Sequence, residues 1–202
     1  MDLQNKIQQL QEIYQEYQHK AAGYKANAVC VAGCAYCCTH YGHLDMTTLE
    51  GLRIQFWLQE LPGGEREEIQ QRITANLRDK EQQKPSVCPF LGQDSLCRIY
   101  EVRPFVCRHL YSLQQCGEQG PVVHSGAMQL ARSTIQRIHK LDSTGYSGHM
   151  SFILALLERK GFLGLYKAGG FDPGRIKGFG KGHGLIINMT AAQGGFTSGK
   201  GQ

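Results

Sequence analysis

The chain has 202 residues, a formal net charge of +5 and eight cysteines. This length suits a single domain that can bury a hydrophobic core without disulfide bonds. The first residues, MDLQNKIQQLQEIY, contain no basic segment followed by an apolar run, and the most apolar stretch, Phe152–Leu157, is too short to cross a bilayer. We therefore expect a cytoplasmic protein that has no membrane partner.

The positive charge is weak evidence for a nucleic-acid partner. The value of +5 counts every thiol as neutral, whereas cysteines bind metals as thiolates. Part of the basic excess would then balance a metal centre, so nucleic acid is not an expected partner.

The first half of the chain predicts three helices around a loop. In residues 1–22 apolar side chains recur every three or four positions, which is typical of an amphipathic helix. Residues 23–45 hold the first cysteines and have little periodicity, so we expect a loop. A capping box, Thr47-x-x-Glu50, begins the next helix, which ends before Pro62, and another helix follows from Glu65 to about Gln82.

The second half predicts two helices and an irregular end. After the cysteine region Cys88–Cys116, Met128 and the apolar residues that follow it mark one helix, and Phe152–Arg159 forms another. Thirteen of the 25 glycines lie in the basic residues 161–202, which we expect to be irregular.

The predicted fold class is therefore mainly α with irregular cysteine-rich loops, in one small domain with a tail. The chain divides into an N-terminal helix (1–22), a cysteine-cluster metal-binding domain (23–160) and a glycine-rich basic C-terminal extension (161–202).

The cysteines form two clusters. These are Cys30-x3-Cys34-x2-Cys37-Cys38 and Cys88-x8-Cys97-x9-Cys107-x8-Cys116. In a reducing cytosol, clustered cysteines hold metal more often than they form disulfides. We therefore predict that these clusters bind metal.

The spacing within the clusters suggests that they share ligands. Because neighbouring side chains point apart, Cys37 and Cys38 serve two different sites, or one of them is not a ligand. The second cluster has gaps of eight or nine residues, which are too wide to close locally as zinc knuckles do. We expect the two clusters to converge on a common metal centre, with the helices of residues 47–82 bringing them together.

The cysteine motifs resemble those of a known family. They are Cys34-x2-Cys37-Cys38, Cys88-Pro-Phe-Leu and Cys97-Arg-Ile-Tyr-Glu-x-Arg-Pro-x2-Cys107-Arg. They are similar to the motifs of YkgJ-type cysteine-cluster proteins, described as zinc- or iron-chelating domains, and the resemblance covers about residues 30–116. It implies that the eight cysteines form a metal centre. Some related proteins are flagellin lysine N-methylases, although no methylase-specific residue matches here. After Cys107 the chain has His109-Leu-Tyr in place of the family's Phe-Pro, which either alters only the local turn or leaves His109 free as an extra ligand.

A second resemblance bears on the kind of metal. The spacing Cys30-x3-Cys34-x2-Cys37 is similar to the cluster motif of radical S-adenosylmethionine enzymes, and Gly63-Gly64-Glu65 is similar to their GGE element. Consecutive predicted helices argue against the partial (β/α) barrel of those enzymes. The spacing still favours an iron–sulfur cluster, of the 4Fe–4S kind, over zinc.

Three functions remain open on the sequence alone. The favoured one is an iron–sulfur protein with a role in redox chemistry or in the modification of a protein or small-molecule substrate. The others are a zinc-binding structural or interaction module and a protein that stores or passes on iron or zinc. Thiolates suit both metals, so ligand type does not separate them. No catalytic residue is identified, and whether the protein is an enzyme stays open.

Overall fold

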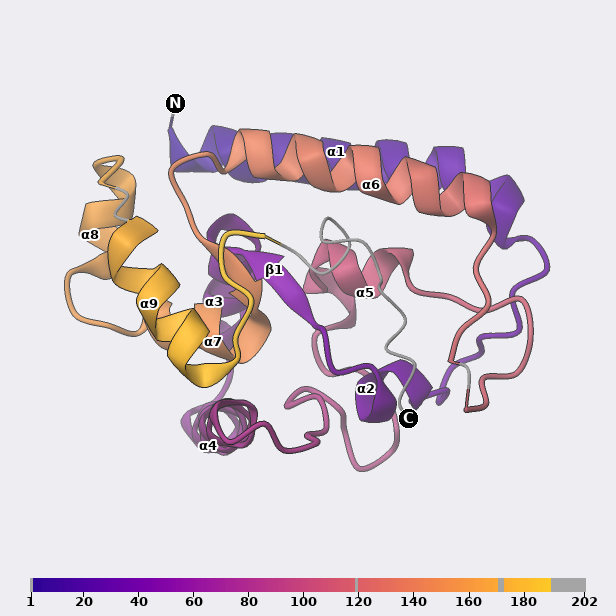
Figure 1. The fold of residues 1–202 in the computed structure, drawn as a ribbon, viewed down its shortest axis with the longest axis horizontal. Helices are drawn as coiled ribbons and strands as arrows, with labels where there is room; N and C mark the ends of the chain where they lie inside the picture. Colours follow the sequence, from indigo (N-terminus) through magenta and orange to yellow (C-terminus); the bar gives the residue numbers. More distant parts are fainter. Residues whose placement is uncertain (1, 119, 171–172, 190–202) are drawn as a thin grey trace.

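The computed structural model describes residues 2–118, 120–170 and 173–189. Their fold is mainly α, as expected (Figure 1). The elements in chain order are α1 (Leu3–Lys25), α2 (Tyr36–His40), β1 (Asp45–Thr47), α3 (Thr48–Glu60), α4 (Gly63–Glu81), the 3-10 helix η1 (Tyr100–Val102), α5 (Phe105–His109), α6 (Ser125–Leu141), β2 (Ser147–His149), α7 (Met150–Leu157), α8 (Phe162–Lys167) and α9 (Pro173–His183).

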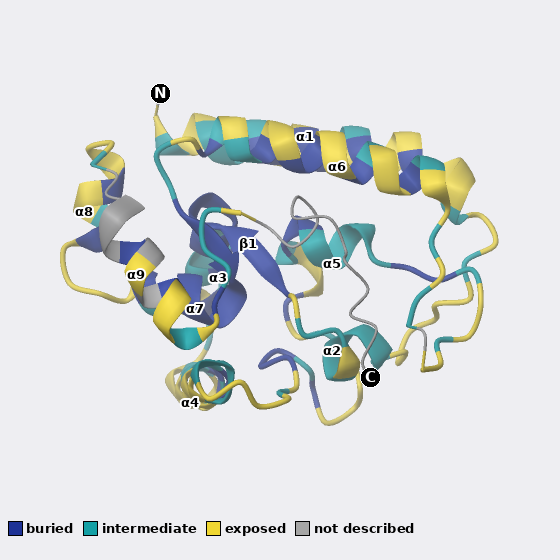
Figure 2. Cartoon of the chain, in the orientation of Figure 1, coloured by how far each residue is buried: buried dark blue, intermediate teal, exposed yellow. Residues whose placement is uncertain are grey.

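The main hydrophobic core lies between α3, α4 and α7, beside the antiparallel ribbon β1–β2 (Figure 2). Its fully buried side chains include Met46, Leu52 and Ile153. Helix α3 approaches α7 closely at Gly51, where a Cβ atom would lie 2.9 Å from side-chain atoms of Ile153 and Leu157. A side chain at this position would therefore push the two helices apart.

The predicted helix boundaries around α3 are confirmed. Thr47 caps α3 in a capping box with Glu50, and the chain turns at Pro62 into α4. The ribbon was not predicted, because its strands have only three residues each and pair across about 100 positions of sequence.

One buried carboxylate joins three helices. Glu50 Oε1 accepts hydrogen bonds from Tyr14 Oη of α1 at 2.6 Å and from the Phe105 backbone N–H of α5 at 2.7 Å. Its Oε2 accepts from the Thr47 backbone N–H at 2.8 Å and from Thr47 Oγ1 at 3.1 Å. These bonds fix α5, which carries Cys107, against α1 and α3.

The glycine-rich C-terminal extension differs from the expected irregular tail. Its residues 162–167 and 173–183 form α8 and α9, and Phe162, Tyr166 and Ile176 are buried against the main core. Three apolar side chains facing the core outweigh the low helix propensity of the intervening glycines. The end of the extension, residues 190–202, lies outside the described residues.

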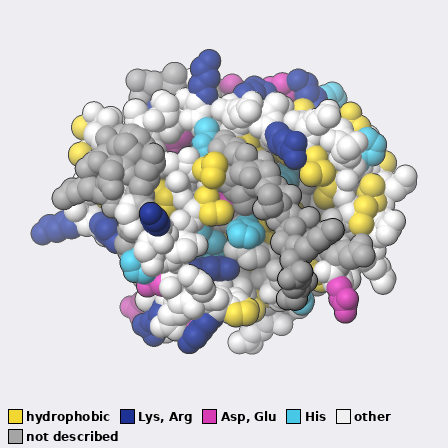
Figure 3. Space-filling view, viewed as in Figure 1, with side chains coloured by type: hydrophobic (Ala, Val, Ile, Leu, Met, Phe, Trp, Pro, Cys, Tyr) yellow, Lys and Arg dark blue, Asp and Glu magenta, His cyan; other side chains and the backbone are white. Residues whose placement is uncertain are grey.

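The basic side chains do not gather in one place on the face that Figure 3 shows; Lys and Arg are dispersed over it. In the described part of the chain, no helix combines the length and the apolar character that a membrane span needs.

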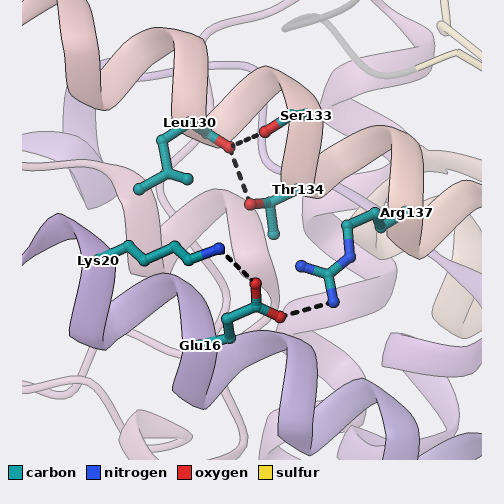
Figure 4. Close-up of polar contacts among 6 residues, drawn as sticks. All are labelled: Glu16, Lys20, Leu130, Ser133, Thr134 and Arg137. Carbon is teal, nitrogen blue, oxygen red and sulfur yellow. Dashed lines mark hydrogen bonds and ion pairs between the residues drawn. The ribbon is translucent and has the colours of Figure 1, made fainter.

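The N-terminal helix is also part of the domain. Helices α1 and α6 lie side by side (Figure 1) and bury a second core that includes Leu10, Tyr17 and Ile138. A polar seam runs along its edge, where Glu16 binds Lys20 at 2.6 Å and Arg137 at 2.7 Å (Figure 4). The predicted amphipathic pattern of α1 is thus confirmed, and its partner is α6.

Candidate metal centre

The short helix α2 separates the two adjacent cysteines of the first cluster. Cys37 and Cys38 are consecutive residues of α2, and consecutive side chains of an α-helix are rotated by about 100°. Their thiols therefore face different neighbours, and each joins three other cysteines.

One group, the outer set, consists of Cys30, Cys34, Cys37 and Cys116. Burial raises the pKa of Cys37 to about 12, and the thiols of Cys116, Cys30, Cys38 and Cys34 lie close enough to raise it further. Burial also raises the pKa of Cys30, whose thiol hydrogen-bonds with that of Cys34. The Ser112 backbone N–H donates to Cys30 Sγ at 3.3 Å and opposes the effect of burial.

The other group, the inner set, consists of Cys38, Cys88, Cys97 and Cys107. The pKa of Cys38 is lowered, first by a hydrogen bond from the Cys88 thiol and then, against the effect of burial, by Arg103. The Cys88 backbone N–H also donates to the Cys38 carbonyl oxygen at 2.7 Å. Cys97 and Cys107 lie near Cys38, and burial raises the pKa of both.

Local backbone structure places the inner-set thiols. Cys97 pairs with Leu91 in an isolated β-bridge, which folds the segment after Cys88 back on itself. The backbone N–H groups two residues after Cys88 and Cys97, those of Phe90 and Ile99, donate hydrogen bonds to the two thiols. Such N–H···S bonds stabilise thiolate ligands.

The two sets differ in burial. Cys88 is a member of the main core, and the other three inner-set cysteines pack against it. Neither core includes a cysteine of the outer set, and Cys30 and Cys34 are exposed. The outer set therefore lies at the surface, whereas the inner set is built into the fold.

Basic side chains lie beside the thiols. The Arg103 guanidinium stacks 3.7 Å from the centre of the Tyr100 ring, and its positive charge opposes the effect of burial on Cys97 and Cys107. Its Nε atom is buried and has no hydrogen-bond partner. Among the described residues, neither Arg103 nor Arg108 forms an ion pair with a carboxylate.

This charge suits a metal centre. Four thiolates around one Zn²⁺, or around a [4Fe–4S]²⁺ cluster, carry a formal charge of −2. Arg103 is half-buried, and its buried Nε has no partner, which is costly for a charged group. The net negative charge of four thiolates and a metal at the inner set would supply its counter-charge.

The thiols of each set are neighbours, but they do not form a closed coordination site. Within the described residues, no group of three or more His, Cys, Asp or Glu side chains is arranged to hold a metal ion. Ligands that metal binding draws together are common in small metal domains, because the thiolates repel one another until the metal is present.

The eight cysteines are thus brought together in two groups of four that meet at α2, where Cys37 lies near Cys38 as well as near the outer set. Each sequence cluster places one cysteine beside the other: Cys38 lies with the inner set, and Cys116 lies with the outer set. Metal binding by all eight cysteines and their convergence on a common centre stay predictions.

The histidines near the cysteine clusters have other neighbours. The ring of His40 stacks on Tyr36 at 4.5 Å. His43, His109 and His139 line a cavity of about 20 Å³ between β1, α5 and α6, and the buried Nε2 atoms of His109 and His139 have no partner. Burial lowers the pKa of His109 to about 4. Sequence spacing could not reveal this cavity, because its residues lie far apart along the chain.

Comparison with known proteins identifies the cysteine-rich segment. Residues 29–123 match the model of a family described as "CxxCxxCC: Putative zinc- or iron-chelating domain". No curated protein and no solved structure matches the chain. The matched segment contains all eight cysteines of both sets. The match agrees with the resemblance of this segment to the YkgJ-type cysteine-cluster proteins.

Proposed function

We propose that the protein carries two iron–sulfur clusters, one in each four-cysteine set, and that it functions in electron transfer. The observation that carries the proposal is how hydrogen bonds group the cysteines: Ser112 N–H donates to Cys30 Sγ and Tyr36 Oη donates to the Gly117 carbonyl oxygen next to Cys116, whereas the Cys88 N–H donates to the Cys38 carbonyl oxygen. Four thiolates fill every protein position on a [4Fe–4S] cluster. A reducing compartment such as the cytoplasm would keep these thiols available.

The residues around each set fit such a cluster. Backbone N–H groups donate to Cys30, Cys88 and Cys97, and the unpartnered Nε of Arg103 lies beside the inner set. Hydrogen bonds to the sulfurs and nearby positive charge are the means by which proteins adjust the potential of a bound cluster. When bound, a cluster of this kind supplies one-electron transfer.

The arrangement of α2 supports electron transfer over catalysis. Cys37 and Cys38 would attach the two clusters to neighbouring residues of one helix, which gives a short covalent connection between them. A radical S-adenosylmethionine enzyme needs a cluster iron that no protein ligand occupies. Here Cys116 supplies a fourth thiol beside Cys30, Cys34 and Cys37, so the structure offers less support for that chemistry or for protein modification.

A second candidate is a zinc protein in which both sets have a structural or metal-handling role. The Cys38 and Cys88 thiols are hydrogen-bonded to each other. Two thiolates on a tetrahedral zinc with bonds of about 2.3 Å lie about 3.8 Å apart, which is close to a thiol–thiol hydrogen-bond distance. This pair therefore favours a mononuclear ion at the inner set.

Metal analysis of anaerobically purified protein separates the candidates. We expect brown protein with about eight iron and eight acid-labile sulfide per chain. Colourless protein with about two zinc and no sulfide would reject the iron–sulfur proposal in favour of the second candidate. The double variant Cys38→Ser/Cys116→Ser, which lacks one thiol in each set, is the control and should contain little of either metal.

A further inference from the structure

The two four-cysteine sets are embedded differently in the protein. All four inner-set cysteines belong to the main core or pack against it, together with fully buried Phe90 and Ile99. Only Cys88 of the inner set is buried in the main core, whereas Cys38, Cys97 and Cys107 are half-buried and pack against it. Among the described residues, no outer-set cysteine belongs to either core. Cys30 and Cys34 are exposed, Val31 between them is 73% exposed, and Cys37 and Cys116 are half-buried.

The backbone that holds the outer set is also the less supported of the two. Cys30 and Cys34 lie in a loop, where Val29 N–H donates to the Ser112 carbonyl oxygen at 2.9 Å and Cys34 N–H to the Val31 carbonyl oxygen at 3.0 Å. Gly33 takes a positive φ of 85° between the two cysteines. Loops with few buried apolar contacts open at a lower free-energy cost than core segments.

The inner set, in contrast, is tied to the helical scaffold. Cys107 lies on α5, which the buried carboxylate of Glu50 holds through the Phe105 N–H. Cys97 is held by the bridge to Leu91. Opening this set would break contacts that also maintain the main core.

We propose that the outer set is an exchangeable metal site, which passes its metal to a thiol-bearing acceptor, and that the inner set is a permanent site that maintains the fold. This inference rests on the proposed binding of metal by both sets, and it holds for either metal. The acceptor is a molecule with two or more thiols that can approach Cys30 and Cys34 from solvent.

The chemistry of exchange is balanced without a change of oxidation state. Each acceptor thiolate would replace one outer-set thiolate on the metal, and the proton lost by the acceptor thiol would pass to the released cysteine. The exposed thiols of Cys30 and Cys34 are the ones that such an acceptor would replace first.

The test follows both metal and thiols in the unaltered protein. Anaerobically purified, metal-loaded protein is incubated with excess dithiothreitol and EDTA, sampled over time, alkylated briefly with iodoacetamide, desalted and analysed for metal and for modified cysteines by mass spectrometry. We expect half of the metal to leave about tenfold faster than the rest. The thiols modified in that first phase should be those of the outer set, and the inner set should stay protected.

Two variants show which set of cysteines releases its metal in the fast phase and which in the slow phase. Cys116→Ser should abolish the fast phase and leave a folded protein that retains the slowly released metal. Cys97→Ser, the matched change in the inner set, should remove the slow phase and lower the melting temperature. If Cys97→Ser does not fold, the alkylation pattern of the unaltered protein still decides the question.

The outcomes distinguish the two proposals. Equal release from both sets, or earlier modification of the inner set, would overturn the inference while leaving metal binding intact. Purified protein without metal, in which all eight thiols react before EDTA is added, would instead reject the proposed function itself.

Discussion

Cys37 and Cys38 are neighbours in the chain, and their thiols belong to different four-cysteine sets. This division follows from α2, because consecutive positions of a helix face different directions. Cys37 lies with Cys30, Cys34 and Cys116, whereas Cys38 is hydrogen-bonded to Cys88. A single helical turn thus connects the set that contains the exposed Cys30 and Cys34 with the set that contains the buried Cys88.

We expect the serine variants of these two residues to affect one centre each. Cys37→Ser should reduce the metal content to roughly half and leave the melting temperature nearly unchanged, because its set lies outside both cores. Cys38→Ser should also remove roughly half of the metal but lower the melting temperature clearly. Elemental analysis and thermal unfolding measure the two effects. Loss of all metal from either variant would point to one shared centre and contradict the two-set arrangement.

The sequence was sufficient to predict five of the helices, α1, α3, α4, α6 and α7, and metal binding by the cysteine-rich segment. The capping box of Thr47 and Glu50 and the periodicity of α1 are local signals, and both are confirmed. The clustering of cysteines is also visible in sequence, and the family match supports metal binding. What remained hidden is the assignment of Cys116 to the first cluster, because this depends on how loops about 80 residues apart meet.

For the C-terminal region, the structure differs from the expectation drawn from the sequence. Its glycines suggested an irregular tail, but propensity is a weak signal when apolar residues can be buried. Phe162 and Tyr166 of α8 complete the main core, and Tyr166 Oη hydrogen-bonds to Asp142 at 2.5 Å. Tertiary packing therefore decided a structure that local composition could not predict.

Replacing Glu50 by Gln should destabilise the protein. All four bonds to the Glu50 carboxylate come from donors, so the amide group of Gln would face a donor in either orientation. The free energy of unfolding should fall by about 2–3 kcal/mol in urea titrations. Glu60→Gln, an exposed change on the same helix, is the control and should have little effect. Equal stability of the two variants would show that Glu50 does not organise the three helices.

Asp142 should make stability depend on pH. Burial raises its pKa to about 6, against the lowering effect of bonds from Tyr166 and the Leu49 N–H. Because the folded state holds this proton more tightly than the unfolded chain does, its stabilising effect is complete below about pH 4 and is lost as the pH rises through about 6. The free energy of unfolding of Asp142→Asn, relative to that of the parent protein, should therefore increase by at most about 3 kcal/mol as the pH rises from 4 to 7.

Urea titrations of both proteins at each pH measure this difference, in which the titration of all other groups cancels. Asp2→Asn, at an exposed position, should follow the parent protein throughout. A constant difference between Asp142→Asn and the parent would mean that the pKa of Asp142 is not raised.

Arg103 should strengthen metal binding at the inner set. Its guanidinium is held over the Tyr100 ring at 3.7 Å, its Nε has no partner, and its charge acts on Cys97 and Cys107. Arg103→Gln removes the positive charge but keeps a polar side chain, so the −2 charge of the bound centre would lose its nearest counter-charge. Loss of such a supporting group typically weakens metal affinity by about tenfold or more.

Competition with a chelator of known affinity measures this change, with release from each set distinguished by alkylation of its cysteines. The inner set should lose affinity, and the outer set should be unchanged. Arg98→Gln is the matched control. Arg98 also carries a guanidinium and follows Cys97 in sequence, but its side chain pairs with Glu65 at 3.4 Å on the exposed surface. If Arg98→Gln weakened the inner set as much as Arg103→Gln, general loss of positive charge would explain both effects, and the specific role of Arg103 would be excluded.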